Sequence, residues 1–403
     1  MRVAYVAPYQ GPSLCRARPV VGNLSLAGSM KVELIAGLLK DKRHEVEIVS
    51  QGEVIELGCK WYPSIAEEEP FDLDIAIHYA SALPIRYING LWSARKTLDL
   101  LKSRHRQAPF DLVIVYNLKR PQMVSADYAI HQLGLPVIFE YEDDSFVDLY
   151  GKLSKGSPYA NLLARFDGAG DGILEKMSGC LGVSPHLLSQ LPPHIPKLLL
   201  RGVVGKDIIE SSKLMTEGKR NWVLFSGTFH KVKGIEQLIQ AWELLQPPGW
   251  ELHITGHGGL ASRLAEMAEK VRGVVLHGLV RREELVRLMC SAKICINPHA
   301  LSETPGNVFA FKIIEYIAAG AHVVSTPMGV LEGEIERGIT YIGANDPRTI
   351  ATTLNEVILG SAWRQTAAEY VCAAYGPGAI SDALDEFLLQ AVEYHRAQKK
   401  AKA

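Results

Sequence analysis

Short runs of Val, Ile and Leu recur along the 403-residue chain, and each is followed by turn residues and then by a longer stretch with helical periodicity. A continuous apolar run of this length is typical of a parallel strand that is buried on both faces. Strands that alternate with helices predict open, doubly wound α/β sheets. The predicted strands are 2–7, 45–50, 73–78, 111–116, 136–141 and 179–184 in the first half, and 222–226, 251–255, 274–277, 294–297, 322–325 and 340–342 in the second.

The alternation is interrupted between residues 198 and 219, which we interpret as a linker between two domains, since the chain is too long for one ordinary core. We predict one domain over 1–201, a second over 202–375, and a C-terminal helix over 376–403 that packs back on the first domain. Two such sheets leave a cleft at the carboxyl ends of their strands, where ligands are expected.

Composition indicates a globular protein, with 47% hydrophobic and 22% charged residues. Lys and Arg (43) nearly balance Asp and Glu (44), so the overall charge does not favour nucleic acid as a partner. The N-terminal apolar run ends at Pro8, which is too short for a signal peptide, and no stretch approaches the ~18–20 apolar residues of a spanning helix. These features predict a cytoplasmic protein, or one held at a membrane surface.

A lysine-containing loop follows the first strand of the second half. Gly227 begins the loop, Lys233 and Gly234 end it, and a helix is predicted from Ile235. A glycine turn at a strand end lets backbone N–H groups face an anion, and the helix N-terminus adds positive potential. Lys233 can then meet a phosphate as a point charge. The alternative is an ordinary loop with solvated lysines.

The next glycine-rich loop contains Gly256, His257 and Gly258, which superficially fits a dinucleotide-binding pattern. Such a site also needs an acidic residue at the end of the following strand to bind the ribose. The strand over 274–277 has none, so we interpret this loop as a structural glycine turn that borders the cleft.

A third segment is an apolar helix with a lysine and a carboxylate three residues apart, Lys312 and Glu315, which ends at Gly320 before a buried strand. A carboxylate on an apolar helix is costly unless it accepts hydrogen bonds, and ribose hydroxyls would donate them. The alternative is an intrahelical Lys312–Glu315 ion pair.

These segments occur in an order that resembles the retaining GT-B glycosyltransferases of glycosyltransferase family 4, which have two Rossmann-like domains. The resemblance implies that Lys233 binds the donor diphosphate, that Glu315 binds the nucleotide ribose, and that the base packs near the turn ending at Val280. It makes the first domain the acceptor domain and the second the donor domain. The implied donor-binding residues are Gly28, Gly227, Thr228, Lys233, Gly256, Val280, Asn307, Val308, Phe309, Lys312 and Glu315.

The chain departs from the family pattern at two positions. Thr228 stands where an arginine is frequent, so we expect Lys231 or Lys312 to supply the second cation. Asn307 stands where a glutamate often faces the sugar, and it retains hydrogen-bonding capacity without the charge. The resemblance also implies that backbone N–H groups from Asn307 to Phe311 contact phosphate.

Two positions in the first half are implied by the same resemblance. Gly28 and Ser29 resemble a loop that approaches the donor phosphate, or else form a flexible loop with an N-cap serine before a helix. Glu142 falls where many family members have a histidine beside the reacting carbon of the sugar, and Asp143 and Asp144 follow it. The implied catalytic residues are Glu142, Lys233 and Glu315; the alternative for Glu142 is a solvated acidic loop.

The segment 88–106 predicts a basic amphipathic helix, since Arg95, Lys96 and other cations accompany its apolar stripe. Such a helix is compatible with anionic lipid or a lipid-linked acceptor, although an ordinary surface helix has the same pattern.

The resemblance implies transfer of a sugar from a nucleoside diphosphate sugar to a hydroxyl acceptor with retention of configuration, with no cofactor and no metal. The acceptor is a glycan, a lipid-linked molecule or a small molecule. Two alternatives are a nucleotide-sugar epimerase on the same fold and an inactive nucleotide-sugar-binding homologue, and Thr228 and Asn307 keep the second one open.

Overall fold

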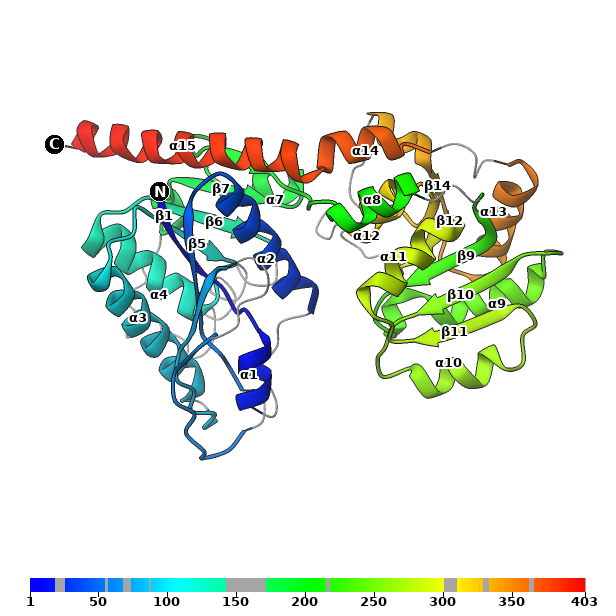
Figure 1. Ribbon diagram of the computed structural model, residues 1–403, viewed down its shortest axis with the longest axis horizontal. Coiled ribbons are helices and arrows are strands. Elements are labelled where there is room, and N and C mark those ends of the chain that lie inside the picture. Colours follow the sequence, from blue (N-terminus) through cyan, green and yellow to red (C-terminus); the bar gives the residue numbers. More distant parts are fainter. Residues whose placement is uncertain are drawn as a thin grey trace. The chain divides into compact units, whose positions relative to one another are not determined.

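The computed structural model describes residues 1–402 apart from 19–25, 55–56, 68–73, 87, 143–171, 215–217, 301–309, 329–332 and 362–365. The chain divides into two compact units (Figure 1). The first comprises Met1–Arg201 together with Ile380–Ala403, and the second comprises Gly202–Ala379.

The first unit is built on an eight-stranded sheet in the order β3-β4-β2-β1-β5-β6-β7-β8. Its strands are β1 (Arg2–Val6), β2 (Glu45–Ser50), β3 (Ile65–Ala66), β4 (Ala76–Tyr79), β5 (Leu112–Tyr116), β6 (Val137–Tyr141), β7 (Gly179–Gly182) and β8 (Lys197–Leu199). All pairings are parallel except that of β3 with β4. Its helices are α1 (Pro12–Ala17), α2 (Leu26–Asp41), α3 (Asn89–Gln107), α4 (Arg120–Tyr128) and α7 (Pro185–Ser189).

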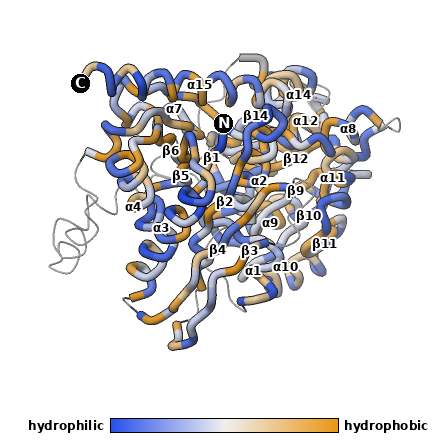
Figure 2. Tube along the Cα trace, turned by 60° about the vertical axis from the view of Figure 1, so that its left-hand side comes forward, coloured by the Kyte–Doolittle hydropathy of each residue, from blue (hydrophilic) through white to orange (hydrophobic). Residues whose placement is uncertain are grey.

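The long C-terminal helix α15 (Pro377–Lys402) belongs to the first unit from Ile380 onward. Ser381 donates a hydrogen bond from its hydroxyl to the carbonyl of Leu38, over 3.0 Å. A Cβ on Gly179 would lie 2.8 Å from the Phe387 ring, so the helix packs directly against the backbone of β7. Hydrophobic and hydrophilic segments alternate along α15 in Figure 2, as expected for a helix with one buried face.

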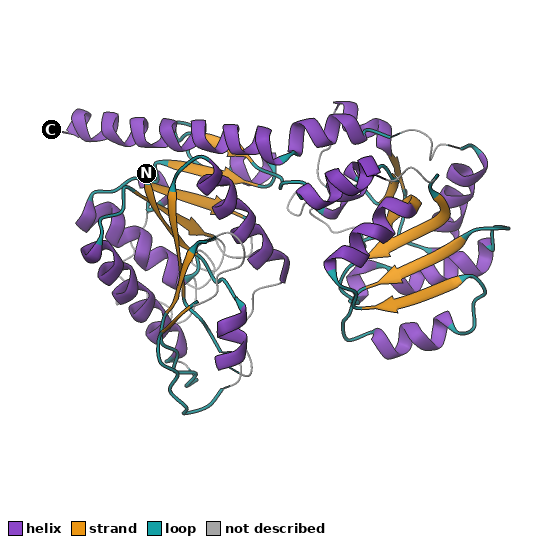
Figure 3. Ribbon diagram, viewed as in Figure 1, coloured by secondary structure: helices purple, strands orange, loops and turns teal. Residues whose placement is uncertain are grey.

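The second unit is built on a six-stranded parallel sheet in the order β11-β10-β9-β12-β13-β14. Its strands are β9 (Arg220–Ser226), β10 (Glu251–Thr255), β11 (Val274–Gly278), β12 (Ala292–Asn297), β13 (His322–Ser325) and β14 (Ile339–Tyr341). Its helices are α8 (Lys206–Leu214), α9 (Ile235–Leu245), α10 (Ala261–Ala268), α11 (Arg282–Ser291), α12 (Lys312–Ala318), α13 (Pro347–Leu359) and α14 (Ala368–Tyr375). Figure 3 shows these helices around the strands.

Strand β9 shows why the apolar runs are continuous. Val223 and Phe225 lie in one hydrophobic core with α9 and α13, whereas Leu224 lies in another with α11 and α12. Because both faces are covered, every position in the middle of the strand needs an apolar side chain. The prediction of two doubly wound α/β sheets is therefore confirmed.

Every strand predicted from the sequence is present, with ends that shift by a few residues. The sequence did not predict β3 or β8, because strands of two and three residues are too short to produce a recognisable apolar run. Among the residues described, no helix is long and apolar enough to cross a membrane.

Candidate functional site

The strand order of the second unit reverses direction between β9 and β12. From β9 the chain adds β10 and β11 on one side of the sheet, and then β12, β13 and β14 on the other. In open α/β sheets, ligands bind outside the carboxyl ends of the strands at such a point. The residues that follow Ser226 of β9 and Asn297 of β12 are therefore the first candidates for a site.

Glycines bring the loops after β9 and β10 into direct backbone contact. The Gly227 N–H donates to the carbonyl of Thr255 over 3.1 Å. Gly256 has φ +145°, and a Cβ there would lie 1.8 Å from the carbonyl oxygen of Gly227. Only glycine fits so close an approach. Gly256 therefore allows the two loops to pack closely. Gly227 has no side chain to cover its own backbone groups.

Lys233 ends a single 3-10 turn, Lys231–Lys233, before α9. The N–H of Ala300 donates to the carbonyl of Val232 over 2.8 Å, which ties this turn to the segment after β12. Gly234 has φ +69°, and a Cβ there would meet the Pro298 carbonyl at 1.9 Å. This close packing half-buries Lys233, and burial lowers the pKa of its ammonium group.

Lys312 is the first residue of α12 and reaches back to the end of β9. Its ammonium donates to the carbonyl of Ser226 over 3.2 Å and lies 4.3 Å from the centroid of the Phe225 ring. It forms no ion pair with Glu315, so the alternative of an intrahelical pair is wrong. Helical side chains point toward the helix N-terminus, so Lys312, at the start of α12, extends beyond the helix end. Glu315, one turn later, instead contacts Arg282 of the neighbouring helix α11.

Lys233 and Lys312 repel each other at the carboxyl ends of the strands. Burial and the charge of Lys233 lower the pKa of Lys312 to about 7. Burial, and then both lysines, also lower the pKa of His299, which follows β12. Within the described ranges, no carboxylate lies at ion-pair distance from Lys233 or Lys312. Such a group of cations attracts an anion, and a diphosphate matches its spread of charge.

Glu315 lies on the same helix and is held by an arginine that the sequence analysis missed. Its side chain is 19% exposed, and its Oε1 accepts from Arg282 Nη1 over 3.0 Å. Arg282 Nε in turn donates to Asp207 Oδ2 over 2.7 Å. Burial raises the pKa of Glu315, and Arg282 opposes that rise. These contacts join α8, α11 and α12, which are distant in sequence, so no local pattern indicated them.

The other residues predicted to bind the donor differ in how exposed they are. Val280 is half-buried in the turn after β11, next to Leu279, which is 69% exposed. Thr228 is exposed. Of the two residues proposed for the second cation, Lys231 is exposed and Lys312 interacts with Lys233. The predicted residues Asn307, Val308 and Phe309 lie outside the described residues.

In the first unit, Glu142 directly follows β6 and is half-buried. Its N–H donates to Asn117 Oδ1 over 2.9 Å, and its carboxylate pairs with Lys31 of α2. Its side chain is only 15% exposed, so the alternative of a solvated acidic loop is wrong for this residue. The hydrogen bond to Asn117, which directly follows β5, holds Glu142 against the neighbouring strand and so keeps it partly buried. Asp143 and Asp144 lie outside the described residues.

A second carboxylate, Glu140, lies fully buried behind Glu142. Lys31 Nζ is 3.6 Å from Glu140 Oε1, and the Tyr5 hydroxyl donates to Glu140 Oε2. Burial raises the pKa of Glu140, and the charge of Lys31 opposes the rise. The sequence analysis treated Glu140 as part of a strand. An acidic residue inside an otherwise apolar run was the signal that could have revealed it.

Gly28 and Ser29 lie within the first turn of α2, which begins at Leu26. The predicted helix start near Ser29 is therefore late, and Ser29 is not the N-cap residue. Its hydroxyl instead accepts a hydrogen bond from the N–H of Gln10 over 3.2 Å. Gly28 is buried.

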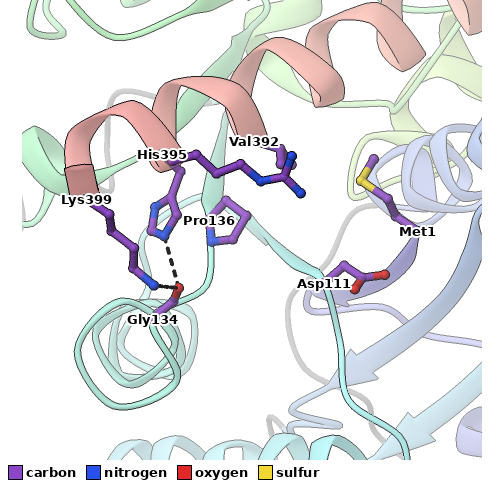
Figure 4. A pocket seen from close by; sticks show the side chains of 8 residues that line it. Met1, Asp111, Gly134, Pro136, Val392, His395 and Lys399 are labelled. Carbon is purple, nitrogen blue, oxygen red and sulfur yellow. Dashed lines mark hydrogen bonds between the residues drawn. The ribbon is translucent and has the colours of Figure 1, made fainter.

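A cavity of about 330 Å³ lies in the first unit at the amino ends of the strands (Figure 4). Met1, Asp111 and Pro136 line it, and each directly precedes a strand. His395 and Lys399 of α15 both donate to the carbonyl of Gly134, as the dashed lines of Figure 4 show. Since both side chains bond to the backbone and the cavity lies at the amino ends of the strands, we do not assign it to the candidate site.

Helix α3 buries its apolar stripe against α4, as an ordinary surface helix does. Several of its cations have partners within the unit. Arg104 Nε lies 2.8 Å from Glu47 Oε2, and Lys96 Nζ lies 3.2 Å from Asp99 Oδ2.

Two doubly wound α/β units, with a pair of lysines at the strand reversal of the second, define a protein of the GT-B fold. Residues 220–359 match the family model described as Glycosyl transferases group 1, which covers most of the second unit. This match and the GT-B fold together support a glycosyltransferase.

Solved structures resemble the chain over nearly its full length. Sucrose-phosphate synthase from Thermosynechococcus elongatus has a TM-score of 0.66 and 16% identity, covering 97% of this chain and 99% of that one. The catalytic domain of starch synthase IV from Arabidopsis thaliana, bound to ADP and acarbose, has a TM-score of 0.63 and 12% identity, covering 98% and 99%. Anabaena HepE in complex with UDP has a TM-score of 0.62 and 14% identity, covering 96% and 99%. No curated protein matches the sequence. At these identities the structural likeness establishes the fold.

Proposed function

We propose that this protein is a retaining glycosyltransferase, similar to glycosyltransferase family 4, that transfers a sugar from a nucleoside diphosphate sugar to a hydroxyl acceptor. The observation that carries the proposal is the group of charged side chains at the strand reversal of the second unit. Two lysines there have no acidic partner among the described residues, and a largely buried carboxylate lies on the helix that begins with one of them.

The chemistry of a nucleoside diphosphate matches these groups. Its phosphates carry the negative charge that Lys233 and Lys312 lack, and its ribose carries hydroxyls that donate to Glu315. We assign the second phosphate cation to Lys312, because Lys231 is exposed and Thr228 replaces the family arginine. The complexes of HepE with UDP and of starch synthase IV with ADP support a nucleotide-sugar donor.

The proposed reaction breaks the bond between the anomeric carbon and the leaving phosphate oxygen and forms a bond from that carbon to the acceptor oxygen. The leaving phosphate takes the acceptor proton on the same face of the sugar, which gives retention. Lys233 and Lys312 stabilise the charge that develops on the diphosphate, which is the role expected of preorganised cations. No metal or cofactor takes part in this scheme. We assign Glu142 to the charge that develops on the sugar.

A donor screen tests this proposal. UDP-, GDP- and ADP-sugars are first compared by thermal shift, and transfer to candidate acceptors is then followed with and without EDTA. We expect Lys233→Gln and Glu315→Gln each to lower kcat/KM by ~30–100-fold, about 2–3 kcal/mol for a lost charge-assisted interaction. Lys231→Gln, in the same turn but exposed, is the matched control and should leave kcat/KM unchanged.

The product distinguishes the alternatives. NMR of the new glycosidic bond establishes whether configuration is retained. Formation of an epimer from donor alone would identify an epimerase instead. Unchanged turnover in both site variants would refute the assignment of the site.

A further inference from the structure

Arg282 connects three helices of the second unit at the point where the ribose is expected. It is the first residue of α11, and it directly follows the turn that contains Val280. Its guanidinium meets Asp207 of α8 through two nitrogens, with Nε 2.7 Å from Oδ2 and Nη2 3.3 Å from Oδ1. Its Nη1 donates to Glu315 Oε1 over 3.0 Å. A guanidinium held at two nitrogens has a fixed plane, so its third contact fixes the direction of the Glu315 carboxylate.

The contact leaves the second carboxylate oxygen of Glu315 available. Oε1 is engaged by Arg282, and Oε2 has no hydrogen-bond partner in the described part of the chain. The Glu315 side chain is 19% exposed, so a ligand can reach it. The arrangement therefore presents one oriented acceptor oxygen to an incoming hydroxyl.

We infer that Arg282 is a positioning residue for recognition of the nucleotide ribose, which acts by orienting Glu315 while Asp207 holds the guanidinium in place. This inference rests on the proposed function, since it assumes a ribose at Glu315. It adds two residues to the site that no part of the sequence pattern indicated.

The charges around Glu315 give the inference a distinctive signature. The charged groups that interact with it are Arg282 from α11 and Asp207 from α8, and the neighbouring Tyr316 on α12 stays neutral because burial raises its pKa. Arg282 lowers the pKa of Glu315, whereas Asp207 raises it. An ionised carboxylate is a stronger acceptor for a ribose hydroxyl than a protonated carboxyl, so affinity is lost as pH falls through the pKa of Glu315.

Removal of Arg282 and removal of Asp207 should therefore have opposite effects on the acid limit of nucleotide binding, the pH below which affinity is lost. The test titrates UDP, ADP and their 2′-deoxy forms against the full chain by calorimetry between pH 5 and 8. We expect Arg282→Gln to weaken binding of the ribonucleotide that wild type prefers by ~10-fold or more at pH 7, and to move the acid limit upward. Asp207→Asn should move that limit downward. Arg287→Gln on the same helix, where Arg287 pairs with Glu284, is the matched control and should change neither.

The deoxy forms separate positioning from a merely structural role. Wild type should prefer the ribose form over the 2′-deoxy form, and Arg282→Gln should reduce that preference, whereas Arg282→Lys should restore part of it because it keeps the charge. If Arg282→Gln proves unstable, Arg282→Lys and Asp207→Asn still give the pH shifts. An unaltered preference in Arg282→Gln, or shifts of the same sign in the two variants, would overturn the inference while leaving the proposed function intact. Failure of UDP, ADP and the GDP-sugars of the donor screen to bind wild type would instead overturn the proposed function, and this inference with it.

Discussion

Each unit places lysines near the carboxyl ends of its strands, but the charged groups around those lysines differ. Lys31 of the first unit lies against two carboxylates, Glu140 and Glu142, behind the carboxyl end of β6. Lys233 and Lys312 of the second unit have each other as charged neighbours and, among the described residues, no acid at ion-pair distance. The charges of the first arrangement pair within the protein, whereas we propose that a ligand completes the second. A strand reversal thus fixes where a site lies, and the local charge balance decides what it binds.

The difference predicts opposite consequences when a cation is removed. In the first unit the loss should appear in stability, because a buried carboxylate is left without its partner. In the second unit the loss should appear in ligand affinity, with stability unchanged or improved, because mutual repulsion is relieved.

The largest effect is expected from Lys31→Met. Its ammonium is 16% exposed and its partners Glu140 and Glu142 are 0% and 15% exposed, so we expect the free energy of unfolding to fall by about 3 kcal/mol. Without Lys31, which opposes the burial-driven rise, the pKa of Glu140 rises further, so the loss of stability grows as pH increases. Urea unfolding at pH 6 and pH 8 measures both the size and the direction.

Lys40→Met is the matched control for that variant. Lys40 lies on the same helix and pairs with Asp74, which is 96% exposed, so its removal should cost less than about 1 kcal/mol. The double variant Lys31→Met, Glu142→Gln should regain part of the stability. Equal losses in the Lys31 and Lys40 variants would contradict the contrast between the units.

A smaller effect concerns the pH dependence of donor binding. Burial and the charge of Lys233 lower the pKa of Lys312 to about 7, and a diphosphate bound beside it would raise that pKa. A group whose pKa rises on binding contributes affinity that is complete below its free pKa and is lost as pH increases toward its bound pKa. Affinity for a nucleoside diphosphate should therefore fall by up to ~10-fold for each pH unit above 7.

Calorimetry in two buffers of different ionisation enthalpy checks this prediction through the proton uptake on binding. Lys312→Arg keeps the charge throughout this range and should abolish the dependence. A wild-type affinity that stays constant between pH 7 and 9, or that rises, would show that Lys312 does not face the phosphates.

The smallest effect is expected on helix α3. Its pairs with Asp99 are at the surface, where Arg95 is 72% exposed, so the helix retains cations that can face anionic lipid. We propose peripheral membrane contact through this helix, with a contribution of ~1 kcal/mol per cation near the surface. Cosedimentation with phosphatidylserine vesicles should fall after reversal of Arg95 and Lys96 to Glu. Unchanged binding would limit α3 to a structural role.

The sequence predicted strands and helices correctly where the local pattern of apolar residues matches the burial that the tertiary structure imposes. The run Val223-Leu224-Phe225 predicted a strand covered on both faces, and its side chains do alternate between two cores. The close approach of Gly256 to Gly227 explains a glycine that the sequence could only mark as a turn. The strand β3, two residues long, carried too little pattern to be recognised.

The site itself was readable only in part. Lys233 and Glu315 stood out because each is a charge within a recognisable strand–turn–helix or helix–turn–strand pattern. The partners of these charges did not. Glu315 was predicted to bind a ribose, with an ion pair to Lys312 on its own helix as the alternative, and its protein partner is Arg282 of another helix.

The sequence by itself determined the alternation of strands and helices, since apolar periodicity is a local property set by which faces are buried. It also determined which charged residues occupy strand ends and helix starts. Only the tertiary structure decided which charges meet: Lys31 with two acids, Lys312 with Lys233, and Arg282 with both Asp207 and Glu315. The reason is physical. The energy of an electrostatic interaction depends on the distance between the charges and on their burial. Neither quantity follows from the separation of two residues along the chain.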